Sequence, residues 1–153
     1  MPKPLLLLTR PREGNDRFAA ALSPELRDKV QIVMAPLLDI VPIEPFPDCG
    51  HCDAAIFTSS NGVALAPEGS ARPAYCVGSR TAHEAGRKKW QVVHVAATAE
   101  DLVQALSAKM PSGRVLHFAG QHRRGEVVER LQKLGADISA CVLYDQQERR
   151  LSD

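Results

Sequence analysis

A chain of 153 residues with 44% hydrophobic content can form one ordinary domain, or one domain and part of another. Its 19 basic residues are nearly balanced by 18 acidic ones, which excludes a general nucleic-acid binder, because such proteins have an excess of positive charge. No segment approaches the ~20 consecutive apolar residues that a membrane-spanning helix needs, so we expect no membrane association.

The first 34 residues predict a strand, a helix and a second strand. The apolar run in Leu5–Thr9 is too short for a secretory signal and indicates a buried strand. A helix is expected at Asn15–Leu22, where apolar residues recur on one face, and another strand at Val30–Met34. Because a β-α-β unit cannot bury both faces of a sheet, we expect residues 1–34 to be part of an incomplete domain.

Residues 35–47 contain four prolines within thirteen positions. Proline has no backbone N–H to donate to a neighbouring strand. This segment is therefore predicted to be an extended connector and a domain boundary.

Residues 48–142 predict a complete domain in which short apolar strands alternate with helices. Strands are expected at Ala54–Thr58, Tyr75–Val77, Val92–Val95, Val115–Ala119 and Ile138–Tyr144. Helices are expected at Asn61–Leu65, Thr81–Trp90, Glu100–Lys109 and Arg124–Leu134. This alternation predicts an α/β fold with a doubly wound parallel sheet.

The stretch Cys49-Gly50-His51-Cys52 suggests two kinds of site, a redox dithiol and a metal centre. A redox dithiol follows a strand and begins a helix, whereas this stretch precedes a strand. Cys49, His51 and Cys52 are only half of a zinc site, and no second pair completes it. We therefore expect an ordinary loop with no metal. Without a secretory signal the chain is expected to be cytoplasmic, where its cysteines stay reduced.

Polar residues follow every predicted strand end, where doubly wound sheets bind ligands. Hydroxyl groups, free N–H groups and guanidinium groups at these ends predict a site for a ligand with several carboxylates or phosphates. Taken singly, a hydroxyl at a helix start is more often a cap, and Thr81–Glu84 and Thr98–Asp101 both have capping-box spacing. The candidates for binding are Arg10, Ser59, Ser60, Asn61, Ser79, Thr81, Thr98 and Arg124.

Several of these segments, in this order, resemble the uroporphyrinogen-III synthase family. The resemblance rests on LLLTRP, DAAIFTSSNGV, YCVGSRTA, AEDLVQAL and VLHFAGQHRRGEVVERLQKLGADISACVLYDQQE, and it covers essentially the whole chain. It implies two flavodoxin-like domains joined by two extended strands. Residues 143–153 would then be the return connector. Family members continue past this connector to finish the first domain, and we expect the present chain to be shortened relative to them.

The resemblance also implies an activity. The family converts hydroxymethylbilane to uroporphyrinogen III with inversion of ring D and loss of water, in haem biosynthesis. It acts as a monomeric lyase without cofactor or metal. By resemblance, Tyr144 donates a hydrogen bond to the departing hydroxyl. Thr81 binds a propionate or acetate group of the substrate. The turn of Ser59, Ser60 and Asn61 binds an anion, and Arg10 and Arg124 match basic positions facing the cleft.

Three alternatives stay open at this point. The first is a non-catalytic α/β module that binds an anionic ligand, as an inactive remnant of such a synthase. The second is a receiver-like domain, although Thr9-Arg10 replaces the acidic pair expected after its first strand. The third is a thiol oxidoreductase, which the position of Cys49 and Cys52 disfavours.

Overall fold

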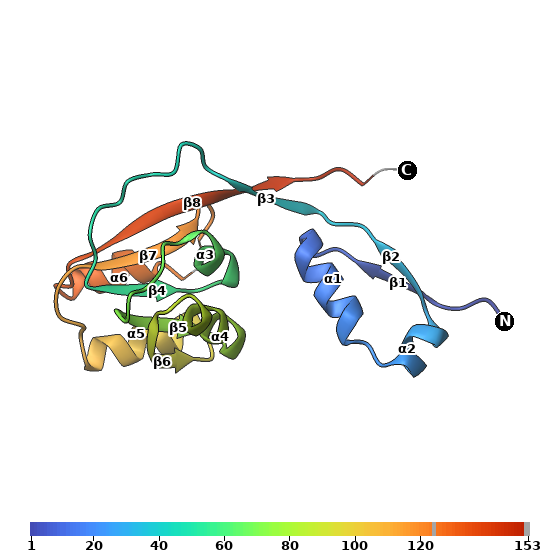
Figure 1. The fold of residues 1–153 in the computed structure, drawn as a ribbon, viewed down its shortest axis with the longest axis horizontal. Helices are drawn as coiled ribbons and strands as arrows, with labels where there is room; N and C mark the ends of the chain where they lie inside the picture. The colour runs from blue at the N-terminus through green and yellow to red at the C-terminus, as the bar shows by residue number, and fades with distance from the viewer. Residues whose placement is uncertain (124, 152–153) are drawn as a thin grey trace. The chain divides into compact units, whose positions relative to one another are not determined.

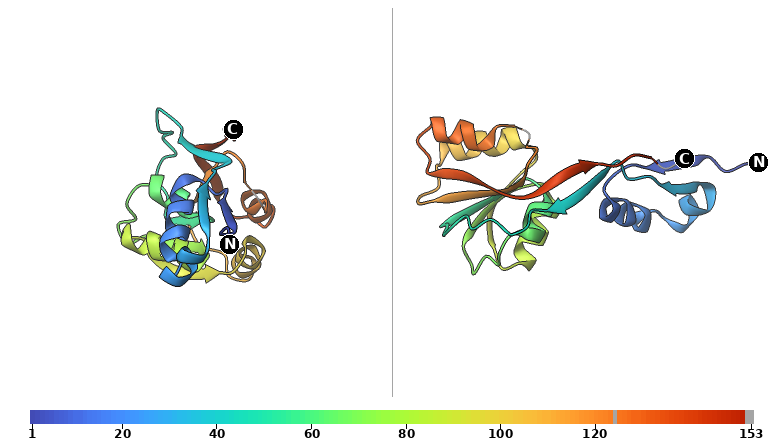
Figure 2. Two further views of the ribbon diagram at one scale, coloured as in Figure 1. Left: turned by 90° about the vertical axis from the view of Figure 1, so that its right-hand side faces the viewer. Right: turned by 90° about the horizontal axis from the view of Figure 1, so that it is seen from above.

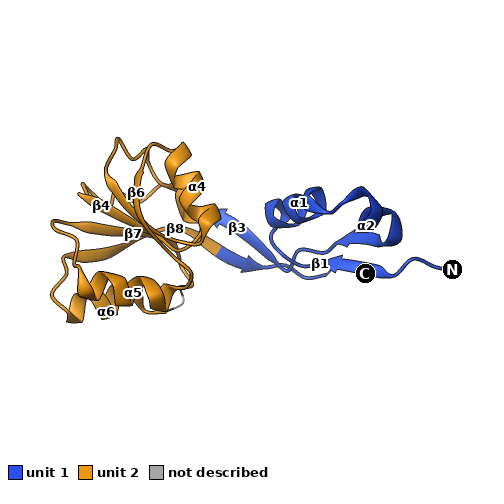
Figure 3. Cartoon of the chain, turned by 90° about the horizontal axis from the view of Figure 1, so that it is seen from below, with its two compact units in different colours: residues 1–41, 146–153 blue, residues 42–145 orange. Residues whose placement is uncertain are grey.

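The computed structural model describes residues 1–123 and 125–151 of the chain. Its contacts divide the chain into two compact units (Figure 3). Unit 1 comprises Met1–Val41 and Gln146–Asp153, and unit 2 comprises Pro42–Asp145. The chain therefore leaves unit 1 once and returns to it near its end. In the described ranges, no helix has the length and apolar character needed to cross a membrane.

Unit 1 contains a two-stranded parallel sheet and two helices (Figure 1). Its elements are β1 (Leu5–Leu8), α1 (Arg12–Ala21), α2 (Pro24–Lys29) and β2 (Gln31–Met34). The buried Asn15 amide donates a 2.8 Å hydrogen bond to the Leu8 carbonyl, which fixes α1 against the end of β1. Helix α2 was not predicted. Its sequence signal is Ser23, which caps the helix, followed by proline at the first helical position.

The proline-rich segment contains strand β3 (Leu38–Pro42). This strand pairs with β8 (Ile138–Glu148). The Ile43 N–H donates to the Leu143 carbonyl at 2.9 Å, and the Arg149 N–H donates to the Leu37 carbonyl at 2.8 Å. Because 37 pairs with 149 and 43 with 143, the two strands run antiparallel. Prolines at the margins of β3 leave its interior N–H groups free to pair.

Unit 2 is a doubly wound parallel sheet, which confirms the predicted fold class. Its strands lie in the order β6-β5-β4-β7-β8, and each neighbouring pair is parallel. Counted from β4 this is the order 3-2-1-4-5, whereas flavodoxin has the order 2-1-3-4-5. The elements are β4 (Ala54–Phe57), α3 (Ser60–Leu65), β5 (Pro73–Val77), α4 (Ser79–Arg87), β6 (Gln91–Ala96), α5 (Ala99–Ala108), β7 (Val115–Gly120) and α6 (Val127–Lys133).

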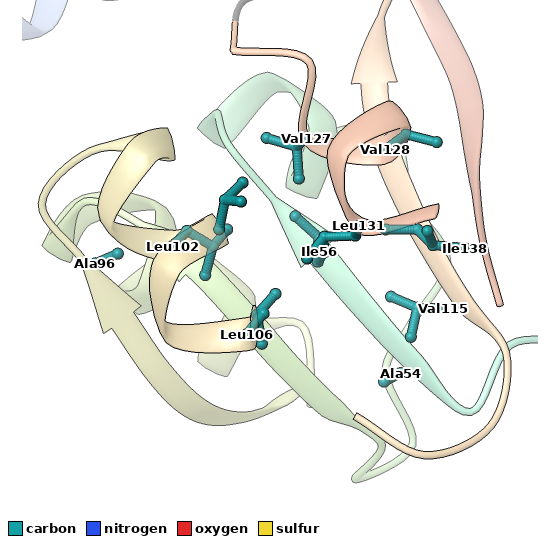
Figure 4. Close-up of a cluster of buried hydrophobic side chains, with 11 residues drawn as sticks. Ala54, Ile56, Ala96, Leu102, Leu106, Val115, Val127, Val128, Leu131 and Ile138 are labelled. Atoms are coloured by element: carbon teal, nitrogen blue, oxygen red, sulfur yellow. The ribbon is translucent and has the colours of Figure 1, made fainter. Parts of the chain in front are cut away.

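Helices cover both faces of this sheet, with α5 and α6 on one face and α3 and α4 on the other (Figures 2 and 3). Strand β4 at its centre is fully buried. Ile56 packs toward Leu102, Leu106 and Leu131 of α5 and α6 (Figure 4). On the opposite face, an aromatic cluster packs with ring centroids 5.4–6.1 Å apart and comprises Phe57, Trp90 and Phe118.

The prediction for the cysteines is wrong in one respect. Cys49 is joined to Cys141 of β8 by a disulfide, although all four cysteines were expected to be reduced. The loop before β4 is thereby held to β8 across 92 residues of sequence. Cys52 is buried and free, and it lies 3.3 Å from a guanidinium nitrogen of Arg72. Spacing along the chain did not reveal this pairing, because sheet order brings the two cysteines together.

Replacement of Ile56 by alanine should destabilise unit 2. Ile56 is 0% exposed at the centre of β4, so the substitution leaves a cavity that neighbouring helices fill only in part. We expect the free energy of unfolding to fall by about 2–5 kcal/mol, measured by urea denaturation. Val93→Ala is the matched control, because Val93 is 48% exposed. This substitution should lower the free energy of unfolding by less than about 1 kcal/mol. Equal losses in both variants would contradict the assignment of Ile56 to the core.

Candidate active site

The parallel strands of unit 2 bring several predicted site residues to one edge of its sheet. Phe57 lies beside Cys76, Val77 beside Ala96, and Gly120 beside Tyr144. The strand ends are therefore level with one another, and α3, α4 and α5 begin directly after three of them. The residues at this edge are Ser59, Ser60, Asn61, Ser79, Thr98 and Tyr144.

Ser59 and Tyr144 form a hydrogen-bonded pair of hydroxyl groups. Ser59 has extended backbone geometry as the N-cap of α3, and its Oγ accepts the Gly62 N–H at 3.2 Å. The same oxygen lies 2.9 Å from the Tyr144 hydroxyl. Tyr144 is 3% exposed, so its ring is held by packing and its hydroxyl by Ser59. The pair joins residues 85 positions apart.

Two glycines permit this approach. A Cβ atom on Gly62 would overlap the backbone carbonyl oxygen of Phe118, so only glycine lets α3 lie this close to β7. A Cβ atom on Gly120 would lie 2.5 Å from the Tyr144 ring, so the ring rests directly against the backbone of β7. The serine and tyrosine are thereby fixed at the same corner of the sheet.

The hydrogen bonds of Ser59 determine what Tyr144 can do chemically. A serine hydroxyl has one proton to donate and two lone pairs to accept with. The Gly62 N–H occupies one lone pair. When Ser59 donates its proton to the Tyr144 oxygen, the phenolic O–H is free to donate to a third group. This arrangement suits a hydrogen-bond donor to a leaving oxygen.

A second, partly buried polar pair lies next to the first. His117 of β7 is 1% exposed, and its Nε2 lies 3.0 Å from the Thr58 hydroxyl. The pKa of His117 is lowered from 6.5 to about 4, mainly by burial of the imidazole and in addition by the Arg123 charge, while the Glu129 charge opposes this shift. The imidazole is therefore neutral near pH 7. The sequence placed His117 in a strand but did not place it beside the candidate site.

The remaining hydroxyl residues differ in their roles. Thr98 caps α5 by accepting the Asp101 N–H at 3.1 Å, which confirms the capping interpretation. Thr81 is not a cap, because α4 begins earlier, at Ser79, with Gly78 as its N-cap. Thr81 is 6% exposed inside that helix, and the capping box predicted for it is therefore wrong. Ser79 is exposed, and Ser60 and Asn61 are partly buried in the first turn of α3.

The two predicted arginines are not among the described residues of unit 2. Arg10 belongs to unit 1, where it is exposed and its guanidinium lies 5.6 Å from the centre of the Phe18 ring. Arg124 lies outside the described residues. Its neighbour Arg123 lies in the loop between β7 and α6, where a guanidinium nitrogen is 3.7 Å from a carboxylate oxygen of Glu129. Among the residues that the structure describes, no group of three or more His, Cys, Asp or Glu could hold a metal ion.

Comparison with known proteins assigns this fold to a family. Residues 17–152 match the family model described as uroporphyrinogen-III synthase HemD. The chain belongs to the uroporphyrinogen-III synthase family. The resemblance seen in the sequence is thereby confirmed. No curated protein matches the chain.

Two solved structures share the fold of this uroporphyrinogen-III synthase family member. The uroporphyrinogen-III synthetase of Helicobacter pylori is 18% identical, with a TM-score of 0.61, and the match covers 99% of this chain and 65% of that one. The uroporphyrinogen-III synthase of the extremely thermophilic bacterium Thermus thermophilus is 16% identical, with a TM-score of 0.58, covering 97% and 63%. The chain thus spans slightly less than two thirds of either structure.

Replacement of Gly120 by alanine should disturb the tyrosine. The added methyl group would meet the Tyr144 ring, so we expect a loss of about 1–3 kcal/mol in the free energy of unfolding. Gly86→Ala is the control, because a Cβ at that helical position would meet no atom within 4 Å beyond its chain neighbours and the backbone of its own helix. The control should stabilise the protein by up to about 1 kcal/mol. An unchanged free energy of unfolding in Gly120→Ala would show that the Tyr144 ring does not rest on β7.

The free energy of unfolding should fall as the pH decreases from 6.5 toward 4. In this interval unfolded His117 gains a proton and folded His117 does not, because its folded pKa is about 4. The expected loss at pH 4 relative to pH 7 is about 3 kcal/mol. Urea denaturation over this pH range tests it, with His117→Gln as the comparison. Identical pH profiles for both proteins would refute the depressed pKa.

Proposed function

We propose that this chain catalyses the uroporphyrinogen-III synthase reaction in the cytoplasm, as a monomer and without a cofactor. The reaction cyclises hydroxymethylbilane to uroporphyrinogen III, with inversion of ring D and loss of water. The observation that supports it best is the Ser59–Tyr144 hydroxyl pair at the carboxyl edge of the sheet, in a chain of this family.

In this proposal, Tyr144 assists departure of the substrate hydroxyl. The C–O bond breaks, and its electron pair leaves with the oxygen. The phenolic O–H donates a hydrogen bond to that oxygen, where negative charge develops. The Ser59 hydroxyl donates its proton to the Tyr144 oxygen, so the phenolic proton of Tyr144 points away from Ser59 and toward the substrate. Departure of hydroxide leaves an azafulvene cation, which the far end of the linear tetrapyrrole attacks through a spiro intermediate that inverts ring D. The proton released when the ring closes combines with the hydroxide to give the water that is lost.

The other residues at the edge are proposed to fold the substrate. Hydroxymethylbilane has eight carboxylates, and helix starts with exposed N–H groups attract anions. Ser79 and Thr98 begin or cap two such helices, and both are exposed. Bringing the substrate ends together lowers the entropic part of the barrier. The proposed carboxylate contacts are Ser59, Ser60, Asn61, Ser79, Thr81, Thr98, Arg10 and Arg124.

The alternative is a non-catalytic module that binds the same anionic ligand. It is favoured by the sheet of unit 1, in which only β1 and β2 pair among the described residues. The two candidates differ in one measurement, which is the formation of uroporphyrinogen III from hydroxymethylbilane. Binding of hydroxymethylbilane without formation of this product would support the module.

Replacement of Tyr144 by phenylalanine should lower the rate of uroporphyrinogen III formation by about 10²-fold, because one donor to the leaving oxygen is lost. The thermal unfolding midpoint should change little, since the ring and its packing stay. Tyr75→Phe is the matched control, because Tyr75 is the second of the two tyrosines and lies on β5, outside the edge. Equal rates in wild type and Tyr144→Phe would remove Tyr144 from the mechanism.

A further inference from the structure

Two consecutive residues at the end of β4 each make a hydrogen bond to a different strand. The Thr58 hydroxyl meets His117 Nε2 of β7 at 3.0 Å. The Ser59 hydroxyl meets the Tyr144 hydroxyl of β8 at 2.9 Å. The conformation that presents Ser59 to Tyr144 is therefore held on one side by Thr58. The end of β4 is a short link between the two pairs.

We propose that His117 is a positioning residue, which acts through Thr58 to hold Ser59 against Tyr144. The inference rests on the proposed function, because it assigns a residue to that reaction. His117 does not need to touch the substrate. Its contribution is to fix the hydroxyl of Thr58, and with it the peptide that leads into Ser59.

The chemistry of the position supports a specific role. All six residues of β7 are buried, and an apolar side chain in place of His117 would avoid the cost of burying a polar ring. His117 Nδ1 is buried and has no hydrogen-bond partner among the described residues. Local rules are most often broken at functional sites. An imidazole with only one of its two nitrogens paired suits a residue retained for that one contact.

The residue also borders a small cavity. His117 lines a space of about 150 Å³ together with Gln121, Arg123 and Glu126 from the loop after β7. A small polar guest in this cavity that bonds to the imidazole would be a second reason for a histidine at this position. The two reasons lead to different expectations. The contact with Thr58 requires Nε2, whereas a guest in the cavity would use the unpaired Nδ1.

Two substitutions separate these contacts. In His117→Gln the side-chain amide reaches the position of Nε2, so the contact with Thr58 can persist. In His117→Asn the amide reaches only the position of Nδ1, so that contact is lost and the cavity side is kept. We expect kcat for uroporphyrinogen III formation to fall at least tenfold in His117→Asn, with KM within about twofold of wild type. His117→Gln should retain at least a third of the wild-type kcat.

A second readout does not depend on activity. The chain has two tyrosines, so ring-labelled tyrosine gives two NMR signals, and Tyr75 serves as the internal reference. The Tyr144 Cζ signal should shift in His117→Asn and stay near its wild-type position in His117→Gln. If the histidine variants do not fold, Thr58→Val should shift the same signal and Thr58→Ser should not, because only serine keeps the hydroxyl.

The outcomes are distinct. No uroporphyrinogen III from the wild-type chain would overturn the proposed function, and the Tyr144 signal would still decide the coupling. An unshifted Tyr144 signal in both His117→Asn and Thr58→Val would overturn the inference. Greater activity in His117→Asn than in His117→Gln would also overturn it, since the cavity side would then be the functional one.

Discussion

The candidate site depends on close backbone approach between α3, β7 and β8, which two glycines make possible. Gly62 lets the first turn of α3 rest on the Phe118 carbonyl, and Gly120 lets the Tyr144 ring rest on β7. A methyl group at either position would push the elements apart. A hydrogen bond tolerates only a few tenths of an ångström of such movement. The 2.9 Å contact between Ser59 and Tyr144 therefore reflects the absence of two side chains.

The order of the strands places this contact where the sheet changes direction. From β4 the chain winds outward through β5 and β6, and it then crosses to the opposite side of β4 to form β7 and β8. Loops on either side of such a switch point diverge, which leaves room for a ligand at the carboxyl ends. Four polar side chains lie at this point, on strands β7 and β8 or directly after β4. They are Thr58, Ser59, His117 and Tyr144. Elsewhere in unit 2 the strands contribute apolar side chains to the core beneath α5 and α6.

The family of the chain and the proposed roles of its residues rest on different observations. The match over residues 17–152 establishes the family, and the solved relatives, at 18% and 16% identity, establish only the fold. The proposed roles depend on hydrogen bonds within unit 2. The disulfide from Cys49 to Cys141 lies in the same unit, on the strand that carries Tyr144. It helps to fix this strand beside the loop that leads into β4.

The sequence was most informative where burial determines structure. Largely apolar runs predicted strands at Ala54–Thr58 and Val115–Ala119, and the structure has fully buried parallel strands at Ala54–Phe57 and Val115–Gly120. The runs are largely apolar because both faces of such strands are covered. The hydrophobic pattern of the sequence did not reveal α2, because this helix is too short to show a helical period. It also did not reveal β3, because the prolines in this segment argued against a strand, although the residues between them pair with β8. The polar residues at the strand ends lie at one edge for a related reason, since neighbouring parallel strands end at the same edge of the sheet.

What the sequence alone determined is the alternation of strands and helices, and with it the fold class and the edge where polar residues gather. The tertiary structure decided which of those residues meet. Ser59 and Tyr144, Thr58 and His117, and Cys49 and Cys141 are pairs separated by 85, 59 and 92 residues. Such pairs follow from strand order and register, and local patterns contain no information on either.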